Sequence, residues 1–501
     1  MSGENSSKPT VSVTRTHVTI VDSNGVATSE TAKTNDEAVE LVEAAIARFR
    51  LAGWRDWQKS YDYETKTHTS TPRDQAEVKG LSAPSAEWIE RLRKAPDDDA
   101  ARLVLADELM QKSDPLGELI AVQCALHRAG PEPDANSAET RRLKLRESAL
   151  LKSHAERWTA ELQRYTTTFT FARGFVDEAR LGANTLVKHA RAVFEAAPLL
   201  RSLEMLGTPE PGELDELFRV PGMARLERLL ASHTEVAEAL VRAVDFKNLK
   251  SLVLQSANLG DARVAALVGA PQLAHLERLD LGDNELGGAA ASAIGRAGLR
   301  LRALLLYKNS ILAEGAKALA ASPHLSDLEE LGLGGNKIGS DAVERMAGAF
   351  RKLIWLDLRR SNLAPKGYSA LAASRGFDSV RTLDLLGNKV GAPGAEALAK
   401  GGGLASLTDL DLCQTKLGDD GVAKLVEAPF LAHVTKLNLR SNALTDKSAN
   451  VLAGAEVLAN LTSLNLNNND FTAKGRKTLA ASKSLAKCRI YVDGGVQPLK
   501  R

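Results

Sequence analysis

Residues 276–286 read LERLDLGDNEL, and this stretch decides the fold because its pattern returns along the chain. Leu276, Leu279, Leu281, Asn284 and Leu286 define the frame L-x-x-L-x-L-x-x-N-x-L. The frame returns as LEELGLGGNKI at 328–338, VRTLDLLGNKV at 380–390 and VTKLNLRSNAL at 434–444. Apolar residues at alternate positions predict a short strand that buries one face. An alanine-rich stretch follows each copy, as in GAKALAA at 315–321, and its composition predicts a helix.

The frame fits the sequence twelve times, at intervals of 23 to 27 residues. It opens at Leu200, Leu226, Leu249, Leu276, Leu301, Leu328, Leu353, Val380, Leu407, Val434, Leu461 and Leu485. Repeated units of strand, turn and helix predict an α/β solenoid with a parallel sheet on its concave face, because helices are wider than strands. The frame resembles leucine-rich repeats of the ribonuclease-inhibitor type, which the Ran GTPase-activating proteins also use.

The frame asparagines are expected to hold the turns together. They are Asn284, Asn309, Asn336, Asn388, Asn442 and Asn469. Main-chain groups buried at a turn need polar partners, so each side chain is predicted to bond adjacent turns and form a ladder. In two repeats the asparagine stands one place later, at Asn258 and Asn362, and Thr415 replaces it in a third. These three turns are predicted to depart slightly from the regular path.

The remaining strand positions of the frame are predicted to point onto the inner surface. Twelve strands spaced by ~4.8 Å make that surface on the order of 50 Å long. The candidate partner-binding residues on it are Tyr307, Trp355, Asp357, Arg359, Asp384, Asp409, Asp411 and Arg440. Asp280, Asp357, Asp384 and Asp411 share one frame position, which predicts an acidic stripe. Exposed aromatic rings beside fixed charges are typical of a protein-binding hot spot, whereas a merely solvated face gives such rings no stabilising role.

The N-terminal sequence predicts a disordered tail at 1–10, followed by a small α+β domain at 11–58. Residues 11–21, VSVTRTHVTIV, alternate and are rich in β-branched side chains, which predicts a strand with Asn24-Gly25 as its turn. Residues 38–54 predict an amphipathic helix that ends at Gly53-Trp54. This arrangement resembles a bacterial WGR domain in degenerate form, because the Trp-Gly-Arg signature is missing.

Residues 59–83 are polar without periodicity and predict a linker. Residues 84–165 predict a helical capping domain, with a helix pair at 138–162, before the solenoid at 166–501. The stretch at 167–181 is expected to supply the first strand of the solenoid. PDDDAARLVLADEL at 96–109 and DPLGELIAVQCAL at 114–126 resemble the repeat-companion domain that precedes leucine-rich repeats in many bacterial proteins. This resemblance implies a bacterial source.

The composition narrows the classes of partner and location. The formal net charge is only +2 and aromatic residues make up 4% of the chain, so no nucleic-acid partner is expected. The N-terminus carries no apolar core of a signal peptide, and no run of eighteen apolar residues occurs, so no membrane association is expected. Three scattered cysteines favour a reducing compartment. The sequence therefore predicts a cytoplasmic protein.

Several groups have both a chemical and a structural interpretation. Asp97, Asp98 and Asp99 could be metal ligands, but helix capping and a solvated first turn explain them better. Cys413 falls on the outward side of its strand and is expected to be exposed, yet no histidine neighbours it in sequence to make it a nucleophile. The glycine-rich stretches lack the Lys-Ser/Thr of a phosphate loop. No metal, cofactor or catalytic residue is predicted.

These observations predict a non-catalytic scaffold that recognises a protein partner through the concave face. One alternative is a regulator of a small GTPase, by resemblance to the repeats of the Ran activators. That function needs a residue that orients water or stabilises charge, for which only Arg359 and Asn388 are conceivable. Another alternative is a sensor or substrate in a bacterial defence or signalling system. The sequence does not identify the partner.

Overall fold

The computed structural model describes residues 10–14, 17–21, 27–31, 41–42, 54–62, 67–75, 84–130, 137–210, 212–493 and 495–497. The chain divides into two compact units, Met1–Ala231 and Ser232–Arg501. The second unit contains most of the repeats, and the first contains two non-repeat regions and the earliest repeats.

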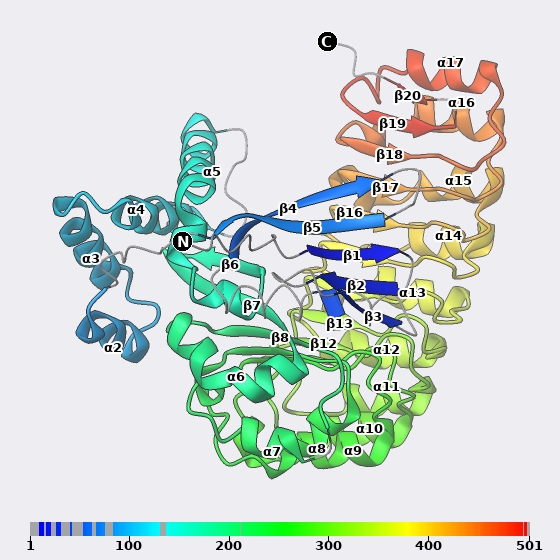
Figure 1. The fold of residues 1–501 in the computed structure, drawn as a ribbon. Helices are drawn as coiled ribbons and strands as arrows, with labels where there is room; N and C mark the ends of the chain where they lie inside the picture. Colours follow the sequence, from blue (N-terminus) through cyan, green and yellow to red (C-terminus); the bar gives the residue numbers. More distant parts are fainter. Residues whose placement is uncertain are drawn as a thin grey trace, which may run out of the picture. The chain divides into compact units, whose positions relative to one another are not determined.

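The second unit alternates a short strand with a helix along its whole length (Figure 1). Its strands are β10 Ser251–Val253, β11 Arg278–Asp280, β12 Ala303–Leu305, β13 Glu330–Gly332, β14 Trp355–Asp357, β15 Thr382–Asp384, β16 Asp409–Asp411, β17 Lys436–Asn438, β18 Ser463–Asn465, β19 Arg489–Val492 and β20 Gly495–Gln497. They lie in the sheet in chain order. The described pairs are parallel except that β20 runs antiparallel to β19.

The helices of this unit follow the strands and form its outer layer, so that the strands lie inside the arc of helices (Figure 1). They are α8 Thr234–Arg242, α9 Gly260–Val268, α10 Gly288–Arg296, α11 Leu312–Ala320, α12 Gly339–Ala349, α13 Pro365–Ala373, α14 Gly391–Ala399, α15 Gly418–Leu425, α16 Asp446–Gly454 and α17 Ala473–Ala481, with short 3-10 helices at Pro271–Leu273, Arg375–Phe377, Pro429–His433 and Glu456–Leu458. The frame leucines are buried between the two layers; Leu383, for example, is 1% exposed. The predicted α/β solenoid is confirmed.

The pairing register confirms the frame through most of this unit. The central leucines stand opposite one another from strand to strand, as in Leu279 with Leu304 and Leu304 with Leu331. At the C-terminal end Leu464 stands opposite Ile490 and not opposite Cys488, so the frame predicted to open at Leu485 is placed two residues too early. A shift of two residues keeps the same side chains on the buried face, so the apolar pattern alone did not distinguish the two registers.

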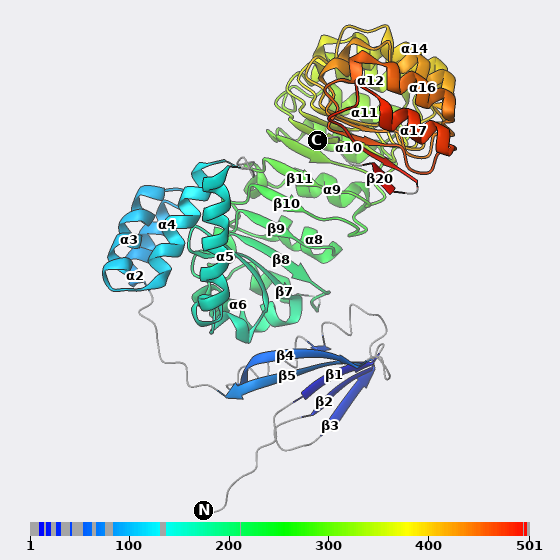
Figure 2. The same cartoon turned by 90° about the horizontal axis from the view of Figure 1, so that it is seen from above.

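The first unit contains a group of helices, seen together in Figure 2, followed by the earliest repeat strands. The helices are α2 Ala86–Lys94, α3 Asp99–Gln111, α4 Pro115–Arg128 and α5 Ala138–Trp158, with a 3-10 helix at Leu162–Arg164. The strands are β6 Thr168–Ala172, β7 Phe175–Gly182, β8 Ser202–Leu206 and β9 Arg228–Leu230, with α6 Ala183–Ala196, α7 Glu213–Leu217 and a 3-10 helix at Met223–Arg225. Helix α6 packs against β7 and β8. Strands β7, β8 and β9 are parallel, and β6 is antiparallel to β7.

Two predictions about this unit are wrong in detail. The expected helix pair at 138–162 is one long helix, α5, because no glycine or proline interrupts residues 138–158. The expected single strand at 167–181 is a hairpin, β6 and β7, that turns at Arg173-Gly174. Its parallel strand β7 continues into the repeat sheet through β8.

The N-terminal sheet also differs from the prediction. Its strands are β1 Thr10–Thr14, β2 His17–Val21, β3 Ala27–Thr31, β4 Trp54–Asp62 and β5 Thr67–Gln75, in the order β3-β2-β1-β5-β4. The single strand predicted at 11–21 is therefore an antiparallel pair. The predicted linker at 59–83 contains the end of β4 and all of β5, because threonine and tyrosine are polar yet favour strands. Most of the predicted helix at 38–54 and the Asn24-Gly25 turn lie outside the described residues.

Candidate binding surface on the repeat strands

The candidate surface consists of the strand-face side chains of β12 to β17. In-register pairing places equivalent frame positions of successive strands beside one another, so the side chains form columns. The candidates fall into three columns. Trp355 and Asp409 share the first, Asp357, Asp384 and Asp411 the second, and Tyr307, Arg359 and Arg440 the third.

The carboxylate column is Asp357, Asp384 and Asp411, which stand opposite one another in three adjacent strands. Asp280 has the same frame position, but Leu305 and Gly332 stand between it and Asp357. The predicted stripe of four aspartates therefore contains three neighbours and one isolated member.

Each residue of this column also has a structural role that the sequence analysis missed. The carboxylates of Asp357, Asp384 and Asp411 accept a hydrogen bond from the main-chain N–H two residues later, over 2.9, 2.9 and 2.7 Å. Asn438 and Asn465 do the same over 3.1 Å in the next two strands. The signal was present in the sequence as an aspartate or asparagine at one frame position of several repeats.

Arg359 joins two members of the column. Its guanidinium donates from Nε and from a terminal nitrogen to both oxygens of Asp357, over 2.9 and 2.7 Å, and its Nε lies 3.3 Å from Asp384. Asp357 has no exposed surface. The prediction that Asp357 projects toward a partner is therefore wrong, because the arginine two residues later covers it. The hydrogen bond that Arg359 donates to Asp357 raises the pKa of Arg359.

Asp384 is the most perturbed carboxylate of the surface. Burial raises its pKa to about 7, and the neighbouring charges of Asp357 and Asp411 act in the same direction. The N–H of Leu386 and the guanidinium of Arg359 oppose this shift without cancelling it. Three carboxylates in adjacent strands thus repel one another while one guanidinium lies among them.

The neighbouring polar groups are arranged in pairs. The Asp409 carboxylate lies 2.8 Å from the ammonium group of Lys436. The Asn438 amide donates to Asp411 over 2.9 Å. Arg440 is exposed.

The two aromatic candidates are half-buried, each against a glycine of the preceding strand region. A side-chain carbon added to Gly282 would lie 2.3 Å from Cζ of Tyr307, and one added to Gly332 would lie 3.4 Å from the indole of Trp355. The rings therefore cover backbone, which gives them a stabilising role that the sequence analysis did not expect. Burial raises the pKa of Tyr307 to about 12.

Cys413 is buried, which contradicts the expected exposure. Burial raises the pKa of its thiol, and the charge of Asp411 adds to the effect. A raised thiol pKa lowers the thiolate fraction, which is the opposite of what a nucleophilic cysteine requires.

The frame asparagines lie at the edge of the strand layer and bond the main chain of adjacent turns. The Asn388 Oδ1 accepts from the N–H of Ser361 over 2.9 Å, and its Nδ2 donates to the carbonyls of Leu358 and Leu385 over 2.7 and 2.9 Å. Equivalent bonds are made by the other members of this asparagine ladder, namely Asn284, Asn309, Asn336, Asn442 and Asn469. Thr415 donates to the carbonyl of Leu412 over 2.8 Å from the same position.

The three turns without a ladder asparagine follow the same path as the others, so the predicted departure is wrong. In the regular turn around Asn284 the flanking residues Asp283 and Glu285 have positive φ. The same pattern occurs at 256 and 258, at 360 and 362, and at 414 and 416. Asn258 and Asn362 occupy a left-handed position, which asparagine tolerates better than most residues.

No group of three or more histidine, cysteine, aspartate or glutamate residues is placed to hold a metal ion within the described ranges. Among the described helices, none has both the length and the apolar character needed to cross a membrane.

The comparisons agree with the repeat geometry. A family model described as Leucine Rich repeat matches residues 272–295, 379–399, 430–453 and 457–480. No curated protein sequence matches the chain. The chain carries leucine-rich repeats arranged as a solenoid.

Three solved structures share features of this architecture at low identity. A chain from the yeast Rad7 and Elc1 complex is 15% identical, with 77% of this chain and 88% of that chain covered and a TM-score of 0.40. An internalin from Listeria monocytogenes is 18% identical, with 60% and 83% covered and a TM-score of 0.36. A leucine-rich-repeat protein of Leptospira interrogans is 18% identical, with 60% and 91% covered and a TM-score of 0.29.

Proposed function

We propose that the protein is a non-catalytic scaffold that binds a protein partner through the strand face of β12 to β17. The observation that carries this proposal is the carboxylate column beside Trp355. The indole remains partly accessible, and aromatic side chains are frequent anchors of protein interfaces.

The charges of this face favour a partner that presents a lysine or arginine side chain. Arg359 interacts with both Asp357 and Asp384, and Lys436 lies against Asp409. Asp411 accepts its side-chain hydrogen bond from the neutral amide of Asn438. A partner cation placed between Asp384 and Asp411 would relieve their repulsion, which gives an attraction that a solvated face would not offer.

No observation favours the GTPase-regulator alternative. Asn388 is 2% exposed and bonds the turns on both sides, so it is unable to orient water for a nucleotide. Arg359 interacts with two carboxylates of its own surface. Neither of the two conceivable residues is therefore available for phosphoryl transfer.

The test uses the full-length protein to capture a partner, followed by affinity measurement with both proteins purified. We expect Trp355→Ala to weaken binding by 2 kcal/mol or more, roughly thirtyfold, because truncation removes an interface anchor. The matched control is Trp88→Ala, which removes another half-buried indole, on α2. Retained affinity in Trp355→Ala with lost affinity in Trp88→Ala would place binding on the helices of the first unit and would contradict the proposal.

A second pair of variants tests the charge argument. Asp384→Asn keeps the shape of the side chain, and we expect weaker binding in buffer above pH 7, where the native carboxylate is ionised. Asp341→Asn on α12 removes an exposed carboxylate from the helix layer and is expected to leave affinity unchanged. Equal loss in both variants would indicate a long-range effect of net charge in place of a contact at the strand face.

A further inference from the structure

The turn between β6 and β7 contains a residue that its backbone conformation disfavours. Arg173 and Gly174 form this two-residue turn, with φ of 51° and 91°. Such turns match the twist of the paired strands but require positive φ, which favours asparagine or glycine. Glycine is the expected residue at the second position, whereas arginine at the first has a steric cost.

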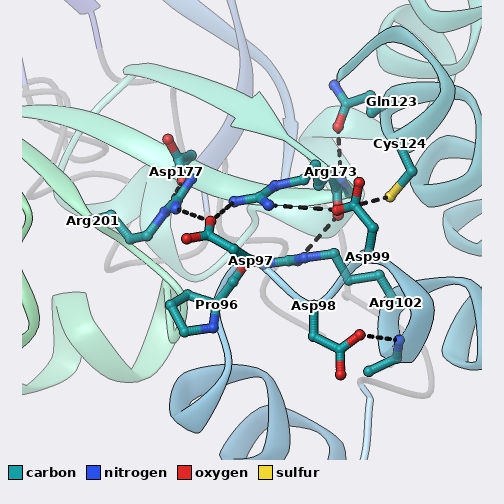
Figure 3. A network of polar contacts seen from close by, with 12 residues as sticks. Pro96, Asp97, Asp98, Asp99, Arg102, Gln123, Cys124, Arg173, Asp177 and Arg201 are labelled. Carbon is teal, nitrogen blue, oxygen red and sulfur yellow. Dashed lines mark hydrogen bonds and ion pairs between the residues drawn. The ribbon is translucent and has the colours of Figure 1, made fainter. Parts of the chain in front are cut away.

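The side chain of Arg173 explains why this residue occupies the turn. Its side chain is 4% exposed, and its guanidinium lies between two carboxylates at the start of α3, 3.2 Å from Asp97 and 3.4 Å from Asp99 (Figure 3). Its carbonyl accepts a hydrogen bond from Arg102 over 3.3 Å, and Arg102 also donates to the carbonyl of Pro96 over 2.9 Å. Both the side chain and the main chain of the turn are therefore bound by the segment at 96–102.

These contacts also refine the interpretation of the aspartate cluster. Asp98 caps α3 by accepting from the N–H of Ala101 over 2.9 Å, as the sequence analysis expected. Asp97 and Asp99 instead hold Arg173, which lies 76 and 74 positions away from them along the chain.

Gly174 is bound by a different helix. Its N–H donates to Oε1 of Gln123 on α4 over 2.6 Å. A side-chain carbon at this position would lie 2.1 Å from Cγ1 of Ile120, so the helix leaves no room for one. The tip of the hairpin thus lies against both the start of α3 and the middle of α4.

Arg201, just before β8, adds a second connection. Its guanidinium lies 3.4 Å from Asp97 and 2.6 Å from Asp177 (Figure 3). It also lies 3.5 Å from Glu227. Asp97 therefore contacts two arginines of the repeat region at once.

The apolar contribution across this junction is small. The buried cluster under α2 to α5 has twelve members, of which Phe175 and Leu199 alone come from the repeat region. The other ten lie between residues 92 and 150, so the helices keep most of their own core without the repeats. Phe171 of the hairpin also packs against this cluster, and the polar contacts centred on Arg173 add specific attachment at the same junction.

We propose that the Arg173-Gly174 turn is a latch that holds the helical domain at residues 84–165 on the first repeat strands, and that this domain is released as one unit when the latch opens. Release would uncover Phe175 and Leu199, which creates an apolar surface that is otherwise closed. The helical domain is then a detachable cap of the repeat array.

Hydrogen exchange measured by mass spectrometry on the full chain tests the latch. Arg173→Met keeps the aliphatic part of the side chain and removes the guanidinium. We expect amide exchange across α2 to α5 to become at least tenfold faster, because the released helices lose the packing of Phe175 and Leu199 against their core, while exchange in β10 to β18 stays at the wild-type rate. The matched control is Arg180→Met in the same hairpin, which removes a half-exposed guanidinium paired with Glu204 and should leave α2 to α5 unchanged.

Asp97→Asn provides a milder variant if Arg173→Met does not fold. Arg173 retains Asp99 in this protein, so a smaller acceleration in the same four helices is expected. Wild-type exchange in α2 to α5 of the latch variants would overturn the proposal. Equal acceleration of α2 to α5 and of β7 to β9 would also overturn it, because the helices and the strands would then open together.

Discussion

Two columns of side chains in the second unit both bond main-chain groups of the repeats, one with neutral amides and the other with carboxylates. In the asparagine ladder, neutral amides bond the main chain of adjacent turns, as Asn388 does with Ser361 and Leu358. In the carboxylate column, Asp357, Asp384 and Asp411 bond the main-chain N–H two residues later. The ladder is buried within the turns, where an unpaired charge would be costly.

The difference shows which feature of the surface the fold does not need. Asn438 and Asn465 stand in the same column as the three aspartates and bond the same main-chain group without a charge. The negative charges of the column are therefore dispensable for the turn. Burial first, and then the charges of Asp357 and Asp411, raise the pKa of Asp384, and this cost of keeping a charge in the column supports the proposed role in binding.

The largest expected effect comes from a buried leucine beside the carboxylate column. Leu383 is 1% exposed and lies in β15, next to Asp384. Leu383→Ala should cost about 2–5 kcal/mol of unfolding free energy, because it leaves a cavity in a strand that supports both columns. Urea unfolding followed by circular dichroism measures this loss. Leu386→Ala, at a half-buried position of the strand face, is the matched control and should cost less than half as much.

The charged column should make stability depend on pH in an unusual direction. In the unfolded chain Asp384 loses its proton near its ordinary pKa of 3.8, whereas in the fold it keeps the proton until about pH 7. The native state therefore binds more protons between these values, and stability falls as pH rises through this window, on the order of 4 kcal/mol in total. Asp384→Asn should remove most of this slope. An unchanged slope in the variant would assign it to other groups.

Removing a side chain of the asparagine ladder should lower the unfolding free energy, and this loss should hardly depend on pH. Asn388→Ala leaves the N–H of Ser361 and two carbonyls without their side-chain partner, so it should cost about 1–3 kcal/mol at any pH between 5 and 8. Asn362→Gly is the control, because position 362 has a φ of 57° that glycine adopts freely. If both variants lose the same free energy, backbone freedom and not the amide bonds would account for the loss.

The sequence predicted the repeat architecture well because the same frame occurs many times, so that each copy supports the interpretation of the others. It failed where a side chain binds a residue whose identity the repeat pattern does not determine. Asp357 was expected at the surface, yet Arg359 covers it. Asp97 is exposed, as expected, but its ion pair with Arg173 was not foreseen. Hairpin β6–β7 and strands β4 and β5 occur once, so no repetition revealed them.

The smallest expected effect concerns buried hydroxyl groups. It tests whether a buried polar group stabilises the fold only when it has a hydrogen-bond partner, as the ladder asparagines have. Tyr368 on α13 is fully buried, and its hydroxyl has no hydrogen-bond partner among the described residues. Thr415 is equally buried, but its hydroxyl donates to the carbonyl of Leu412.

Removing each hydroxyl should therefore change stability in opposite directions. Tyr368→Phe relieves the desolvation of an unpaired group and should be neutral or stabilising by up to about 1 kcal/mol, whereas Thr415→Val should cost about 1 kcal/mol. Thermal unfolding of the two variants beside the wild type measures both signs in one experiment. A loss of about 1 kcal/mol in Tyr368→Phe would mean that its hydroxyl has a partner in solution. The helix layer would then satisfy its buried polar groups as fully as the ladder does.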